Sequence, residues 1–106
     1  MNKKLVITGM GAVTPIGIGV DKYWENLVAG KTGIDHITTI DTEELPVKIA
    51  GEVRDFDPKD YMPRKLSVEM DRFMQLAFAA AQQALVDYAI DAYRTGIAVG
   101  TALNGI

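Results

Sequence analysis

The sequence contains no cysteine, and this absence limits the chemistry that the 106-residue chain can carry out by itself. Disulfides, thiolate metal sites and thiol nucleophiles are all excluded, which is compatible with the cytoplasmic location that we expect. Histidine is nearly absent too, since His36 is the only one and lies in a polar, turn-like stretch. We therefore interpret His36 as an ordinary loop residue and expect no metal site and no cofactor.

Long apolar runs and clusters of positive charge are also missing. No run approaches the roughly 20 apolar residues that a membrane-spanning helix needs. The basic start with its short apolar stretch resembles a signal peptide, but the glycines, threonines and proline of residues 8–17 interrupt it. The net charge is −3, the pI is about 5.0, and no segment interleaves Lys or Arg with aromatics. Neither a membrane nor a nucleic acid is an expected partner.

What the chain does contain is typical of a folded globular protein, with 48% hydrophobic and 24% charged residues. Residues 5–7, Leu-Val-Ile, form a short apolar run before a glycine-rich segment, as a strand buried on both faces would. Apolar residues then recur at helical spacing over 21–29. We expect a short helix there, with Asp21 as its N-cap and Gly30 ending it.

The second half alternates between extended and helical patterns. A short edge strand is expected just after Pro46, and a long helix over 67–88 with Ser67 as its cap. Residues 76–81 of that helix are apolar on every side, so it should be surrounded by other elements. Residues 96–100 read as a second buried strand. The order strand, helix, loop, helix, strand favours an α/β fold with a parallel sheet. Two such strands and the apolar helix cannot cover one another, so sheet edges and apolar side chains would be left exposed.

A glycine motif after the first expected strand raises the question of nucleotide binding. Gly9 and Gly11 match the first two glycines of the dinucleotide fingerprint, but Thr14 stands where the third belongs and Pro15 follows it. No second strand ending in an acid lies about 20 residues further on, as the fingerprint requires. We therefore reject this interpretation. Similarly, we interpret the carboxylates of residues 55–60 as a solvated charged loop.

A basic pair, Arg64 and Lys65, lies just before the expected helix start at residue 67. Positive charge is unfavourable at a helix N-terminus because of the helix dipole, so the pair invites an anionic partner. Alternatively, Glu69 and Asp71 in the first turn neutralise the pair locally. The residues alone leave both interpretations open.

Four segments together resemble the opening of a β-ketoacyl-acyl-carrier-protein synthase of the type II elongating kind, or of a related polyketide ketosynthase. They are residues 6–17 (Val-Ile-Thr-Gly-Met-Gly-Ala-Val-Thr-Pro-Ile-Gly), 23–34, 47–58 and 70–73 (Met-Asp-Arg-Phe). The resemblance implies that residues 1–106 are an incomplete N-terminal portion of a thiolase-like layered α/β/α/β/α fold, which forms a homodimer or heterodimer of synthase subunits. It also implies decarboxylative condensation with malonyl-carrier protein, using a Cys and two His beyond Ile106. The chain alone is then expected to be inactive, with no catalytic residue of its own.

The resemblance assigns two roles within the chain. Arg64 and Lys65 match the start of the basic patch that docks acyl carrier protein, although Val68 and Glu69 stand where relatives often continue with basic residues. Residues 100–105 match a glycine-rich loop that lines the acyl pocket near the dimer interface, in which Leu103 presents an apolar side chain. Ala102 and Asn104 replace expected glycines there, and a plain strand end followed by a turn is the alternative.

Two alternatives to an elongating enzyme of fatty-acid or polyketide biosynthesis remain. One is a non-catalytic partner subunit that resembles a chain-length factor and lacks the nucleophile, which the loss of basic character at Val68 and Glu69 favours slightly. The other is a naturally short interaction module, which its uncovered apolar helix and strand edges disfavour.

Overall fold

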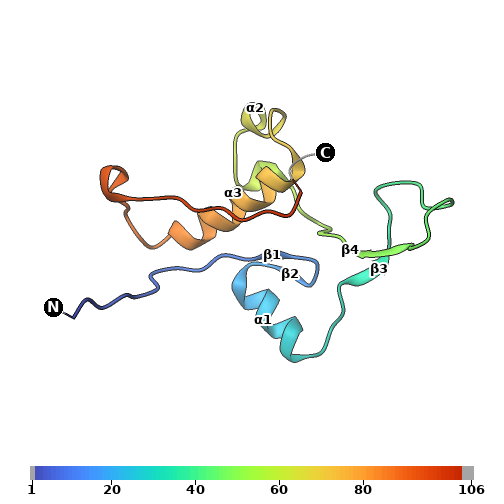
Figure 1. Ribbon diagram of the computed structural model, residues 1–106, viewed down its shortest axis with the longest axis horizontal. Helices are drawn as coiled ribbons and strands as arrows, with labels where there is room; N and C mark the ends of the chain where they lie inside the picture. Colours follow the sequence, from blue (N-terminus) through green and yellow to red (C-terminus); the bar gives the residue numbers. More distant parts are fainter. Residues whose placement is uncertain (1, 104–106) are drawn as a thin grey trace. The chain divides into compact units, whose positions relative to one another are not determined.

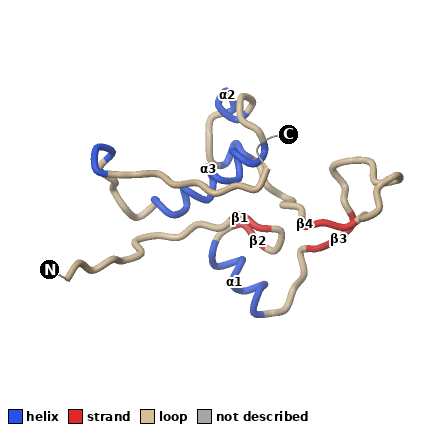
Figure 2. Tube along the Cα trace, viewed as in Figure 1, coloured by secondary structure: helices blue, strands red, loops and turns tan. Residues whose placement is uncertain are grey.

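The computed structural model describes residues 2–103, which divide into two compact units. One unit is residues 12–57. The other combines residues 1–11 with residues 58–106. Figure 1 shows the course of the chain through both units, and Figure 2 shows that loops make up much of it. No helix within the described part is long and apolar enough to cross a membrane.

The unit of residues 12–57 contains two small antiparallel hairpins and one helix. β1 (Val13–Thr14) pairs with β2 (Gly17–Ile18) around a tight turn, in which the Thr14 hydroxyl donates to the Gly17 carbonyl at 2.9 Å. β3 (Ile34–His36) pairs with β4 (Ile49–Gly51), with Ile34 opposite Gly51. β4 confirms the short strand expected after Pro46. His36 lies in β3, so its interpretation as a loop residue was wrong.

Helix α1 (Val20–Val28) confirms the helix expected over 21–29. Its N-cap is Gly19 rather than Asp21, because the chain leaves β2 with a positive φ of 94° that suits glycine; Asp21 lies in the first turn. At the other end Gly30 stops the helix, as predicted. Its φ is 73°, and the Gly30 and Lys31 amides donate to the carbonyls of Leu27 and Asn26 at 3.1 and 3.0 Å. These two bonds form a Schellman motif.

The unit built from the chain ends contains η1 (Pro58–Asp60), α2 (Arg64–Ser67), α3 (Arg72–Leu85) and η2 (Ala92–Arg94). α3 confirms the helix expected over 67–88, but it begins only at Arg72 and ends at Leu85. Ser67 ends the separate helix α2 instead of capping the long helix. The chain breaks between them because Asp71 is extended, with a ψ of 160°. Gln75 stabilises the break, since its Nε2 donates to the Ser67 carbonyl at 2.8 Å and to the Met70 carbonyl at 3.4 Å.

Gly9 and Gly11 pack directly against the backbone of α3. A Cβ added at Gly9 would lie 1.8 Å from the Ala84 carbonyl oxygen, and one added at Gly11 would lie 1.8 Å from the Ala80 oxygen. The spacing matches because two extended residues span about 6.6 Å and four helical residues rise about 6.0 Å. These glycines thus allow an extended segment to approach a helix, a packing role distinct from phosphate binding.

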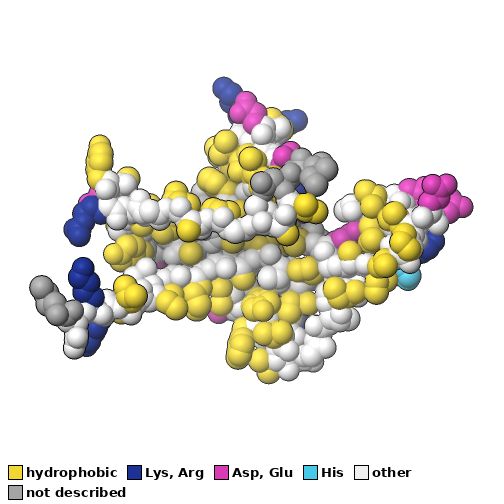
Figure 3. All heavy atoms as spheres, viewed as in Figure 1, with side chains coloured by type: hydrophobic (Ala, Val, Ile, Leu, Met, Phe, Trp, Pro, Cys, Tyr) yellow, Lys and Arg dark blue, Asp and Glu magenta, His cyan; other side chains and the backbone are white. Residues whose placement is uncertain are grey.

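Neither buried strand expected from the sequence forms a strand in the described chain. Leu5 is 97% exposed, Val6 and Ile7 are also exposed, and residues 96–100 are likewise exposed without strand pairing. The predicted parallel sheet was therefore wrong as well. Every strand pair in the described residues is antiparallel. A strand is stabilised only when neighbours satisfy its backbone groups, and these segments have none. The expectation of uncovered apolar area is confirmed, as Figure 3 shows across one face.

Helix α3 is only partly surrounded. Ala79, in its middle, is fully buried, while Ala77 and Ala81 on either side along the sequence are exposed. The all-round apolar character of residues 76–81 is therefore not matched by all-round packing within the described residues.

Candidate functional site

The basic pair predicted from the sequence lies on α2, a single helical turn. Pro63 occupies the N-cap position, and its carbonyl accepts from the amides of Leu66 and Ser67, both at 3.0 Å. The side chains of Arg64 and Lys65 are exposed, whereas Ser67 is buried and its hydroxyl donates to the Arg64 carbonyl at 2.8 Å. The turn is thus anchored by Ser67 and presents both cations to solvent.

Arg64 and Lys65 do not lie just before the N-terminus of a long helix, as the sequence predicts; they are the first two residues of a four-residue helix. One turn has little dipole, so an unfavourable dipole does not explain the pair. What the structure does show is two adjacent exposed cations on a short, anchored turn.

The short helix η1 and the start of α3 surround this turn. η1 contacts both α2 and α3, and Met62, between η1 and α2, is buried. The amides of Tyr61 and Met62 both donate to the Pro58 carbonyl at 3.0 Å, which fixes the approach to Pro63. Together with the Gln75 contacts at the α2–α3 break, these bonds hold the corner that carries Arg64 and Lys65.

The charge around α2 is mixed. Residues 58–72 contain four basic and three acidic side chains, with the acidic Asp60, Glu69 and Asp71 distributed among the basic ones. Figure 3 shows positive and negative side chains side by side near α2, at the top of the view, with apolar side chains beneath them. The surface is therefore only weakly cationic.

Leu103 is the last described residue, and its side chain is 73% exposed. It lies in a bend with Ala102, but the rest of the expected loop, including Asn104 and Gly105, lies outside the described residues. The acyl-pocket role of Leu103 stays a prediction.

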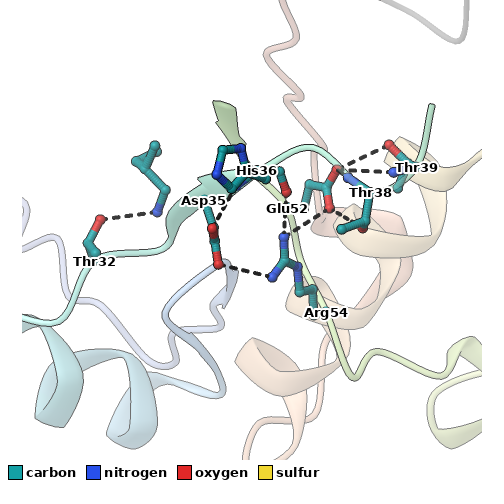
Figure 4. A network of polar contacts seen from close by, with 8 residues as sticks. Thr32, Asp35, His36, Thr38, Thr39, Glu52 and Arg54 are labelled. Carbon is teal, nitrogen blue, oxygen red and sulfur yellow. Dashed lines mark hydrogen bonds and ion pairs between the residues drawn. The ribbon is translucent and has the colours of Figure 1, made fainter. Parts of the chain in front are cut away.

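A polar cluster that sequence reasoning missed lies on the β3–β4 hairpin (Figure 4). Glu52, whose side chain is only 10% exposed, accepts from the hydroxyls and backbone amides of Thr38 and Thr39 at 2.7–3.3 Å. The hydroxyl and amide of Thr38 contribute most to lowering the pKa of Glu52 from 4.5 to about 2. These bonds fix the start of the long hairpin loop.

Arg54 connects this cluster to the strands. Its guanidinium donates to the His36 carbonyl at 2.9 Å and forms ion pairs with Glu52 at 3.4 Å and Asp35 at 3.5 Å. The pKa of Asp35 is lowered, first by the hydrogen bond from the His36 amide and further by the Arg54 charge. The contacts of Glu52 with Thr38 and Thr39, and of Arg54 with His36, join the two sides of the hairpin, so the cluster is a structural clamp. No group of three metal-ligating acidic, His or Cys side chains occurs among residues 2–103.

A cleft of about 370 Å³ adjoins the β1–β2 hairpin and α1. Asn26, buried at its lining, donates through Nδ2 to the Ile16 carbonyl and so ties the hairpin to the helix. The Oδ1 atom of Asn26 has no hydrogen-bond partner within the described part of the chain. The remaining lining residues are Thr14, Pro15, Ile16, Gly17, Ile18, Lys22, Arg54 and Asp55. The cleft brings together none of the site residues expected from the sequence.

Comparison with known proteins gives one consistent result. The family model described as "Beta-ketoacyl synthase, N-terminal domain" matches residues 2–105. The 3-oxoacyl-[acyl-carrier-protein] synthase 2 of Staphylococcus aureus strain COL is 44% identical over 110 residues, covering 99% of this chain and 27% of the relative. A synthase of the same name from Synechocystis sp. is 38% identical over 109 residues, covering 98% of this chain and 26% of that protein.

A solved structure gives the same result. It is described as "The ishigamide ketosynthase/chain length factor" and matches with a TM-score of 0.69 and 38% identity over 81% of this chain and 21% of its own. This likeness confirms the expected fold class, an incomplete α/β portion of a thiolase-like layered fold. The chain spans about a quarter of the length of the relatives it matches.

Proposed function

The chain belongs to the β-ketoacyl synthase N-terminal domain family, and on that premise we propose that residues 1–106 are the N-terminal part of a β-ketoacyl-acyl-carrier-protein synthase. The observation that carries the proposal is the family match over residues 2–105, together with 44% identity to a 3-oxoacyl-[acyl-carrier-protein] synthase 2 along 99% of the chain.

The proposed reaction elongates a fatty-acyl or polyketide chain. An acyl group passes from its carrier thioester to a cysteine thiolate, releasing the carrier thiol. Malonyl-carrier protein then loses CO₂, and the resulting carbanion attacks the enzyme thioester, which releases the thiolate and forms the β-ketoacyl product. Two histidines assist decarboxylation and stabilise the thioester oxyanion.

Residues 1–106 supply neither the thiolate nor the histidine pair of this reaction. They contain no cysteine, and the backbone carbonyl of the single histidine, His36, accepts a hydrogen bond from Arg54 within the hairpin clamp. We therefore infer that a protein made of these residues alone is inactive. Its contribution is structural support and contact with partners.

Acyl carrier protein is the proposed partner of Arg64 and Lys65. Two features support this role: both side chains are exposed on an anchored turn, and their charge complements an acidic protein. Leu103 is proposed to line the acyl pocket, supported by its exposed apolar side chain. A dimer of synthase subunits in the cytoplasm completes the proposal.

A second candidate function is a non-catalytic partner subunit. The description of the structural neighbour at 38% identity names both a ketosynthase and a chain length factor, which supports either type of subunit for this chain. The mixed charge of residues 58–72 favours this alternative, because it weakens the basic docking surface.

The reading frame of the encoding gene beyond the Ile106 codon distinguishes these functions. A frame that continues into a segment with one cysteine nucleophile and two downstream histidines supports the condensing enzyme. The same frame with the cysteine replaced supports the partner subunit. A stop codon directly after Ile106 contradicts the enzyme and leaves a short interaction module.

A further inference from the structure

We draw no further inference here: the strongest candidate, the cleft of about 370 Å³ beside the β1–β2 hairpin and α1, carries none, because the unpaired Oδ1 atom of Asn26 is itself buried out of reach of a ligand, the cations of Lys22 and Arg54 already pair with carboxylates of this chain, and nothing in the structure shows what would occupy the cleft.

Discussion

The carboxylate of Glu52 holds Thr38 with both of its oxygens: Oε1 accepts from the Thr38 amide at 2.8 Å, and Oε2 accepts from the Thr38 hydroxyl at 2.7 Å. The two residues are 14 positions apart, so this contact closes the β3–β4 hairpin loop at its base. Since both bonds favour the ionised carboxylate, they connect the stability of the hairpin to pH.

The stabilisation that Glu52 provides is therefore expected to be lost in acid. The folded pKa of about 2 lies below the unfolded value of 4.5, so the unfolded chain binds more protons between these two values. The contribution of Glu52 should be complete above about pH 5 and should disappear as the pH falls towards about 2. Urea unfolding should show that the Glu52→Gln variant has a lower free energy of unfolding than the unmodified protein at pH 7. This difference should shrink as the pH falls from about 5 towards about 2. Glu44→Gln, in the same hairpin loop, is the control, and an equal loss for both variants contradicts the clamp.

The close approach of the N-terminal segment to α3 predicts that Gly9 and Gly11 do not tolerate a side chain. Gly9→Ala and Gly11→Ala each place a methyl group against a helix carbonyl and should lower the free energy of unfolding by about 1–3 kcal/mol. Gly96→Ala is the control because its Cβ meets no atom within 4 Å. Urea denaturation at neutral pH measures all three. A Gly96→Ala loss as large as the other two would show that the contacts with Ala80 and Ala84 are not the cause.

The end of α1 depends on the left-handed conformation of Gly30. Gly30→Ala is expected to destabilise the protein by about 1–2 kcal/mol, because a Cβ is unfavourable at a φ of 73°. Gly30→Asn should cost less, since asparagine adopts this conformation more readily. Thermal unfolding of the two variants checks this order, and a reversed order contradicts the proposed C-cap.

Gln75 is expected to stabilise the corner that carries Arg64 and Lys65. Gln75→Leu removes the Nε2 donor from the carbonyls of Ser67 and Met70 and should lower the free energy of unfolding by about 1–3 kcal/mol. Gln82→Leu changes an exposed glutamine of the same helix and controls for the added apolar surface. Chemical unfolding compares the two variants. Equal losses of unfolding free energy in the two variants would show that Gln75 does not stabilise the α2–α3 break.

The features that the sequence predicted correctly are those set by local interactions. Gly30 ends α1 because a glycine accepts positive φ wherever a helix stops, and the apolar spacing of residues 21–29 suffices to indicate a helix. The break between α2 and α3 was missed because the side chain of Gln75, eight residues from Ser67, stabilises it. Such a contact leaves no periodic signal.

The two strands expected at residues 5–7 and 96–100 do not form because strands also depend on partners that are distant in the sequence. Residues 5–7 and 96–100 have the composition of buried strands, but a strand exists only where a neighbour pairs with it, and the described chain offers none. At the candidate site, Arg64 and Lys65 are exposed, but the sequence assigned them the wrong helix geometry, and their docking role stays a prediction. The Glu52 clamp was missed because its partners lie 13 and 14 residues away.

The most direct test of the proposed function is a condensation assay on the full-length gene product. Acyl-carrier protein and malonyl-carrier protein are mixed with the enzyme, and release of CO₂ is followed together with formation of the β-ketoacyl product. We expect CO₂ and the β-ketoacyl product to appear in equal amounts with the full-length protein, and neither to appear with residues 1–106 alone. Failure of the full-length protein to form product while it still binds acyl carrier protein would contradict the condensing-enzyme assignment and favour the partner subunit.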